Sequence, residues 1–129
     1  KKERKFKNVL LNNPIVLLSG GETTVTLKGT GYGGRNTEFM LSMAKKLNGI
    51  EGIYGLAIDT DGIDGNMDNA GSFISPKTIL KANERKLNLD NFLQKNDSYT
   101  FFKKINDLII TKPTLTNVND FRAILILPS

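Results

Sequence analysis

A glycine-rich segment followed by an arginine is the first part of the sequence whose residue types could do chemistry. Residues 29–34 read Gly-x-Gly-x-x-Gly, and Arg35 follows directly. Glycine lets a ligand approach the backbone, a helix N-terminus offers free N–H groups, and arginine can hold an anion through two parallel hydrogen bonds. The segment therefore favours a site for a phosphate or a carboxylate. The residues that would contact the anion are Gly33, Gly34, Arg35 and Asn36.

The same spacing also matches a dinucleotide-binding loop, so NAD(P) is an alternative ligand for Gly29–Gly34. A strand-like stretch precedes the loop, a helix-like stretch follows it, and Asp59 ends the next expected strand. Against this alternative, residues 23–28 alternate polar and apolar side chains, whereas the first strand of such a fold is buried on both faces. A flexible surface turn without a ligand is the third interpretation.

Four aspartates within ten residues, Asp59–Asp68, form a second candidate site. The EF-hand pattern needs an oxygen ligand at its fifth position and glycine at its sixth, but here these positions hold Ile63 and Asp64. The stretch is therefore not an EF-hand loop. Two explanations stay open: a solvated turn, or a site for Mg²⁺ or a polar substrate at the end of a buried strand. The candidate ligands are Asp61 and Asp64.

Two further segments offer polar groups at the ends of expected strands. Glu22 follows two glycines and could orient a substrate hydroxyl, or it could form only a surface ion pair with Arg35. Residues 114–120 offer neutral hydrogen-bonding groups that would suit a hydroxylated ligand or an Mg²⁺ shell, although turn formation also explains them. The candidate ligand-binding residues in these segments are Ser19, Gly20, Gly21, Asn117 and Asn119.

The composition narrows the chemistry that these residues could perform. The 129 residues include neither cysteine nor histidine. This excludes disulfides, thiolate or imidazole metal sites, cysteine nucleophiles and a Ser-His-Asp triad. The absence of cysteine agrees with a reducing compartment, and we expect a cytoplasmic protein.

The length and the charge distribution limit the kinds of partner that we expect for this chain. Hydrophobic residues make up 39% of the chain, enough for a core of its own, and no apolar run approaches the ~18 residues of a membrane span. Five of the eighteen basic residues lie in Lys1–Lys7, and the remainder carries thirteen basic and twelve acidic residues. We therefore expect no membrane and no nucleic-acid partner. A non-enzymatic domain that binds nucleic acid through Lys1–Lys7 is the alternative.

The elements that would position these groups alternate between strands and helices. Strands are expected at residues 15–18, 23–28, 53–58, 71–74, 108–110 and 123–127. Helices are expected after an Asn36 N-cap, from Ser75-Pro76 to about Lys86, at 89–94 and at 99–105. This alternation predicts one three-layer α/β/α domain with a mixed, mainly parallel sheet over residues 14–129. Residues 1–13 would be a basic leading segment or interdomain linker.

Several of these segments in this order are more specific than any one alone. They are Ser19-Gly-Gly-Glu-Thr-Thr-Val-Thr26, Gly33-Gly-Arg-Asn36, Thr60-Asp-Gly-Ile-Asp-Gly65, Asn96-Asp-Ser-Tyr99 and Thr111-x-Pro-Thr-x-Thr-Asn-Val-Asn-Asp120. Together they resemble the MOFRL domain, the C-terminal domain of type II glycerate kinases, whose members are often labelled hydroxypyruvate reductases. The resemblance spans roughly residues 14–127.

The resemblance implies a two-domain enzyme that transfers the γ-phosphoryl of ATP, with Mg²⁺, to the 2-hydroxyl of D-glycerate. It implies an active site in the cleft between this domain and a larger, Rossmann-like N-terminal domain that is absent from the sequence. The family's catalytic glutamate and arginine match Glu22 and Arg35. Its catalytic lysine and aspartate would lie in the missing domain, so the resemblance predicts half of an active site, inactive or nearly so alone.

Two positions depart from the family's last motif. Glycine is usual at both of its variable places, where this chain has Lys112 and Leu115. These differences bear on the geometry of the loop and leave the matches at Glu22 and Arg35 intact.

Overall fold

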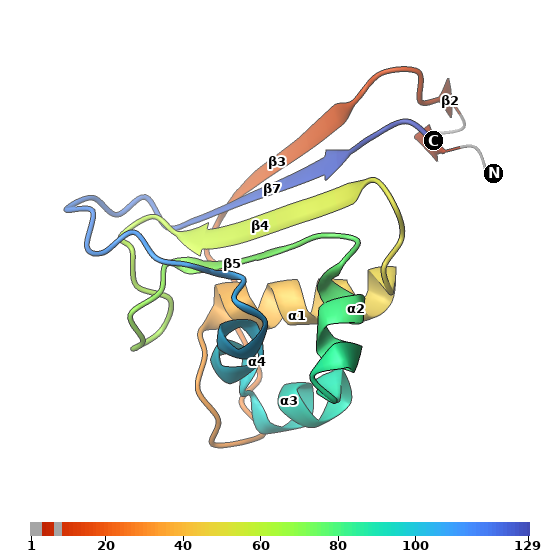
Figure 1. The fold of residues 1–129 in the computed structure, drawn as a ribbon. Helices are drawn as coiled ribbons and strands as arrows, with labels where there is room; N and C mark the ends of the chain where they lie inside the picture. Colours follow the sequence, from red (N-terminus) through yellow and green to blue (C-terminus); the bar gives the residue numbers. More distant parts are fainter. Residues whose placement is uncertain (1–3, 7–8) are drawn as a thin grey trace.

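The computed structural model describes residues 4–6 and 9–129, and its centre is a five-stranded sheet. The strands lie in the order β3 (Ile15–Gly21), β7 (Asp120–Ile126), β4 (Ile53–Asp59), β5 (Gly71–Ile74) and β6 (Leu108–Ile109). A separate antiparallel pair, β1 (Lys5–Phe6) and β2 (Val9–Leu10), precedes β3. This pair lies near the C-terminus, at the end of the sheet where β3 begins (Figure 1).

Four helices lie on one face of the sheet (Figure 1). They are α1 (Arg35–Leu47), α2 (Thr78–Glu84), α3 (Leu89–Lys95) and α4 (Ser98–Ile105). Asn48 ends α1 in the left-handed conformation, and Gly49 follows with a positive φ, as expected for a helix C-terminus. The core between helices and sheet contains Met40, Leu41, Ala44, Ala57, Ile74, Ala82, Phe101, Phe102 and Ile105.

The expectation of a mainly parallel sheet is wrong, because all pairs in the described sheet are antiparallel. The helical connection through α1 does join two strands that run in the same direction, β3 and β4. However, β7 inserts between them and pairs antiparallel with both. The sequence predicts the alternation of strands and helices. It does not predict that the last strand, β7, lies between β3 and β4.

The expectation of three layers is also wrong for the described residues. All four helices cover the same face, and within residues 4–6 and 9–129 no helix covers the opposite face of β3, β7, β4 and β5 (Figure 1). The observed domain therefore has two layers, one of helices and one of strands.

Residues 23–28, expected to be a strand, follow an irregular path. The period-two pattern is present, but this backbone bonds to a side chain and not to a neighbouring strand. The Lys28 N–H donates to Asn96 Oδ1 at 2.6 Å, and Asn96 Nδ2 donates to the Thr26 carbonyl. The expected helix after Ser75-Pro76 is shorter than predicted, because α2 begins at Thr78 and ends at Glu84.

The N-terminal segment is described only in part. Residues 1–3, 7 and 8 lie outside the described residues, so the interpretation of Lys1–Lys7 as a nucleic-acid site is not addressed by the structure. Arg4 donates from Nη1 to the Leu127 carbonyl at 2.6 Å, which joins the beginning and the end of the chain. Among the described residues, no helix is long and apolar enough to cross a membrane.

Candidate functional site

A cluster of charged side chains lies at the end of the sheet where β3 and β4 finish and β7 begins. The strand register places Asp120 opposite both Gly21 and Asp59, so backbone far apart in sequence meets at this edge. Helix α1 begins at the same edge and carries Arg35 on its first turn. Glu22 follows the last residue of β3. The sheet edge therefore brings together the two residues that the resemblance assigns to catalysis.

Arg35 is held by carboxylates on each side of its guanidinium. Its Nε donates to Asp120 Oδ2 at 2.7 Å, and its Nη2 donates to Asp59 Oδ2 at 2.8 Å. Its Nη1 lies 3.6 Å from Glu22 Oε1. The side chains of Asp120 and Asp59 are 0% and 8% exposed, whereas Glu22 is 65% exposed. The two buried aspartates therefore fix the orientation of Arg35, and Glu22 remains on the solvent side.

The buried aspartates titrate differently. Burial alone would raise the pKa of Asp120, but hydrogen bonds from Arg35 and Asn36 outweigh it and the pKa is lowered. For Asp59, burial raises the pKa and the Asp61 side chain adds to this effect, whereas the hydrogen bond from the Asp61 N–H and the charge of Arg35 oppose it. The hydrogen bond to Asp120 in turn raises the pKa of Arg35. Asp120 is thus the firmly ionised partner that keeps Arg35 in place.

Asp64 occupies the N-terminus of α1. Its Oδ1 accepts hydrogen bonds from the N–H and the side-chain amide of Asn36, and its Oδ2 accepts from the N–H and hydroxyl of Thr37. The residue is 0% exposed. Of the groups expected to contact a ligand anion, the Asn36 amide is therefore bonded to a carboxylate of the protein, and the Gly34 N–H donates to Thr37 Oγ1 at 3.1 Å. Asn36 also donates to Asp120 at 2.9 Å, so it links the helix cap to the charged cluster.

The glycine-rich loop packs tightly on the turn between α3 and α4. A Cβ on Gly29 would lie 2.4 Å from the Lys95 carbonyl oxygen, and a Cβ on Gly31 would lie 2.4 Å from Asp97 Cβ. The N–H of Gly29 donates to Asn96 Oδ1 and the N–H of Gly31 to the Lys95 carbonyl. The first two glycines thus allow close packing of the chain on itself, and these two amides are not available to a dinucleotide phosphate.

Arg122 is a member of the site that sequence reasoning missed. Its Nε donates to Ser19 Oγ at 3.0 Å and its Nη2 to the Gly20 carbonyl at 2.9 Å, while its guanidinium lies over the ring of Phe39. It therefore fixes the end of β3 from which Glu22 projects. The available signal was a single arginine directly before the apolar run of residues 123–127.

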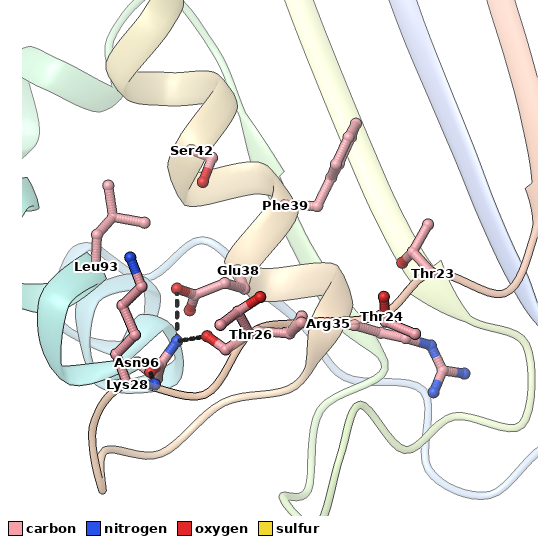
Figure 2. A pocket seen from close by; sticks show the side chains of 11 residues that line it. Thr23, Thr24, Thr26, Lys28, Arg35, Glu38, Phe39, Ser42, Leu93 and Asn96 are labelled. Carbon is pink, nitrogen blue, oxygen red and sulfur yellow. Dashed lines mark hydrogen bonds between the residues drawn. The ribbon is translucent and has the colours of Figure 1, made fainter.

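A cavity of about 520 Å³ lies beside the charged cluster, between residues 23–28 and α1. In Figure 2, Lys28, Glu38 and Asn96 gather at one end, and Arg35 lies at the other with Thr23 and Thr24. Asn96 Nδ2 donates to Glu38 Oε1 at 3.1 Å, and burial raises the pKa of the Glu38 carboxyl despite this bond. The lining residues are Thr23, Thr24, Val25, Thr26, Lys28, Arg35, Glu38, Phe39, Ser42, Leu93 and Asn96.

The remaining predicted ligands lie on two loops that contact each other. Asn117 accepts from the N–H of Asn119 at 3.0 Å, and Asp61 accepts from the N–H of Ile63 at 2.8 Å. The Thr60 hydroxyl donates to the Asn119 carbonyl, which ties the loops together. Within the described part of the chain, no three acidic side chains are grouped so that they could hold a metal ion. Asp61 and Asp64 thus do not form a metal site by themselves.

Fold and site together define the class: a two-layer α/β domain with an arginine clamped by carboxylates at one edge of its sheet. The profile of the MOFRL family matches residues 15–120. The chain belongs to the MOFRL family, as the sequence motifs predicted.

Curated relatives carry the names of two activities. A protein of Agrobacterium vitis with the provisional name hydroxypyruvate reductase is 53% identical over 115 residues, which cover 88% of this chain and 26% of that protein. The D-glycerate 2-kinase of Thermotoga maritima is 46% identical over 119 residues, which cover 92% of this chain and 28% of the kinase. The chain spans about a quarter to a third of the length of such relatives.

Solved structures agree with these matches. The crystal structure of glycerate kinase from Thermotoga maritima matches with a TM-score of 0.89 at 45% identity, over 95% of this chain and 30% of that one. A protein of Pyrococcus horikoshii OT3 matches with a TM-score of 0.81 at 41% identity, over 88% of this chain and 26% of that one. The homologues are thus glycerate kinases and proteins named for hydroxypyruvate reduction, and this chain corresponds to a fraction of each.

Proposed function

We propose that this chain is the C-terminal domain of a glycerate 2-kinase and supplies Glu22 and Arg35 to a site shared with the rest of a longer protein. In that site the γ-phosphoryl group of ATP would be transferred to the 2-hydroxyl of D-glycerate. The observation that carries the proposal is the clamped guanidinium of Arg35, whose Nη1 side faces exposed Glu22. The kinase names of several relatives support it.

The geometry suits phosphoryl transfer, which depends on positioning and charge neutralisation more than on covalent chemistry. Arg35 is 27% exposed and its orientation is fixed before a ligand arrives, so it can bind an anion with little loss of side-chain freedom. The anion would be the transferring phosphoryl group or the carboxylate of glycerate. Glu22 can accept a hydrogen bond from a substrate hydroxyl, since its carboxylate is largely free.

The cavity beside Arg35 offers room for a small substrate. Its near end, at Thr23 and Thr24, presents hydroxyl groups next to the guanidinium. Such groups suit a hydroxy acid, which needs several neutral hydrogen-bonding partners and one cation. We therefore place the hydroxy acid at this end of the cavity, with its charged group toward Arg35.

The fit to Mg²⁺ is poor within this chain. Asp64 is buried and fully bonded to the start of α1, and Asp61 is a single partly exposed carboxylate. Mg²⁺ usually binds one or two carboxylates together with substrate phosphates. The ion would therefore arrive with the nucleotide.

The alternative of an NAD(P)-dependent reductase rests on the names of relatives from Agrobacterium vitis. The glycine-rich loop gives it little support, because the amides of Gly29 and Gly31 already donate to protein oxygens. Titration of the longer protein with NADH and NADPH separates the two activities. Cofactor binding without ATP turnover would favour the reductase.

Glu22→Gln provides the most direct test in the longer protein. We expect glycerate phosphorylation to fall by about a hundredfold, because the carboxylate is replaced by a neutral group of the same shape. The melting temperature should stay unchanged, since the Glu22 side chain is 65% exposed. Glu51→Gln is the matched control, because Glu51 is also exposed but lies away from the site. An unaltered rate in Glu22→Gln alone would remove Glu22 from the mechanism.

A further inference from the structure

The face of the sheet opposite the helices carries apolar side chains on four neighbouring strands. Directly paired residues of antiparallel strands share a face, so the register defines this set. The pairs are Val16 with Leu125, Leu18 with Ala123, Gly20 with Phe121, Tyr54 with Leu125, Leu56 with Ala123 and Phe73, and Ile58 with Phe121 and Gly71. We call these residues the open face.

The open face lacks the polar residues of a solvated sheet. An antiparallel sheet with one face in water normally alternates apolar and polar side chains, whereas the open face has no charged member. Leu18 is 65% exposed, Val16 55% and Tyr54 40%. A shallow hollow of about 270 Å³ lies between these strands and is lined by Val16, Tyr54, Gly55, Leu56, Phe73, Ile74, Ala123 and Leu125. A continuous apolar patch of this kind marks an interaction surface.

We propose that the open face is covered by helices from the part of a longer protein that lies outside this chain. The length of the relatives supports this occupant, since the matched stretch covers only 24–32% of each of four curated relatives. The dimensions also fit, because four strands are about 19 Å wide and two helices packed about 10 Å apart cover that width. The proposal rests on family membership and on this surface, and it does not require the chemistry of Glu22 or Arg35.

The strand sequences agree with a sheet that is buried on both sides. In β4 the open-face residues Tyr54, Leu56 and Ile58 alternate with Ile53, Gly55 and Ala57, so nearly every side chain is apolar. This continuous apolar run is typical of a strand between two layers.

The test measures docking directly. The 129-residue chain is mixed with the separately produced remainder of its parent protein, and the dissociation constant is measured by calorimetry. Leu18→Lys and Tyr54→Lys should each weaken binding by about a hundredfold or more, because an unpaired ammonium would be buried. Leu80→Lys is the matched control, since Leu80 is 56% exposed on α2 in the helical layer. All three variants should keep the circular dichroism spectrum and melting temperature of the unchanged chain.

Each result decides between occupants. A 1:1 complex that the two open-face variants weaken and Leu80→Lys does not would support the proposal. Equal binding by all variants, or no complex at all, would overturn it. A homodimer that Leu18→Lys dissociates, seen by light scattering, would instead assign the face to a second copy of this chain. If the complex of the unchanged chain forms but does not phosphorylate glycerate, that result would count against the proposed function and would not affect the proposed docking surface.

Discussion

Arg35 combines a structural and a proposed chemical role, and the two can be separated. Removal of the guanidinium in Arg35→Ala would leave Asp59 buried without its cation, and Asp120 with only Arg122, whose Nη1 lies 3.8 Å from Asp120 Oδ2. We expect the free energy of unfolding of the chain to fall by about 3 kcal/mol, as for other broken buried ion pairs. Urea denaturation measures this, with Arg85→Ala as an exposed control that should change little. Unchanged stability in Arg35→Ala would mean that the clamp contributes nothing to folding.

Glu38 should make stability depend on pH in a particular direction. Its carboxyl has a raised pKa, chiefly through burial, so the folded state binds the proton more tightly than the unfolded state. Stability is therefore lost as pH rises from the ordinary pKa of 4.5 through the raised folded value, and it stays lower above that value. Glu38→Gln should raise the melting temperature at pH 7 and leave it unchanged at about pH 4.

The control for Glu38 is Glu84→Gln, an exposed carboxylate on α2 that should have no effect at either pH. A gain in melting temperature from Glu38→Gln that is equal at both pH values would contradict the assigned cause, because a packing effect does not titrate. Thermal unfolding followed by circular dichroism is sufficient for both variants.

The sequence predicts Glu22 and Arg35 as site residues because both lie in short motifs. It did not predict that Asp59 and Asp120 hold the guanidinium, or that Arg122 holds the end of β3. These partners come from strands that meet only through the sheet register, and local patterns contain no information about that register. The sequence also predicts Asp64 as a metal or substrate ligand, because local patterns do not show its tertiary contact with the start of α1.

At the scale of elements, the loop before β7 contains non-glycine residues in the left-handed backbone conformation. Lys112 and Leu115, the two departures from the last motif, both have positive φ, 63° and 62°. A side chain in this conformation costs about 1–2 kcal/mol, and the more flexible unfolded state of glycine offsets part of the gain. Leu115→Gly should therefore raise the free energy of unfolding by about 0.5–1 kcal/mol. Leu115 is 98% exposed, so no packing is lost.

Val118→Gly is the matched control for this loop. Val118 is 71% exposed but does not have a positive φ, so glycine there should only increase the entropy of the unfolded chain and lower stability. Chemical denaturation of both variants gives the comparison. A loss of stability in Leu115→Gly as large as that in Val118→Gly would show that the left-handed backbone at residue 115 carries no strain.

Most strands and helices were predicted near their observed places, whereas the direction of the strands was not. The alternation of β and α segments favours parallel sheets. The insertion of β7 between β3 and β4 instead gives two antiparallel pairs, and β5 pairs antiparallel with both β4 and β6. The prediction of a strand at residues 23–28 is wrong for another reason. A period-two pattern describes which side chains are apolar, but a strand also needs backbone hydrogen bonds to a neighbouring strand. Here the Asn96 side chain forms hydrogen bonds with this backbone instead.

At the scale of the whole molecule, the site is open on one side and should not work alone. Among the described residues, Glu22 follows the last residue of β3 at the sheet edge, and 65% of its side chain is exposed. Transfer of a phosphoryl group needs both substrates held in line, which a single open edge cannot do. We therefore expect no glycerate phosphorylation by the 129-residue chain, measured as ADP release with D-glycerate and Mg-ATP.

Addition of the remainder of the parent protein should restore this activity, and the restored rate should saturate with the concentration of the added part. A chain carrying Glu22→Gln should dock equally well and restore little, because it lacks only the group proposed to touch the substrate. A chain carrying Leu18→Lys should need a higher concentration to reach the same rate, because it lacks only docking strength. Turnover by the 129-residue chain without the added part would show that one edge of the sheet is a complete site, and the shared-site proposal would then be wrong.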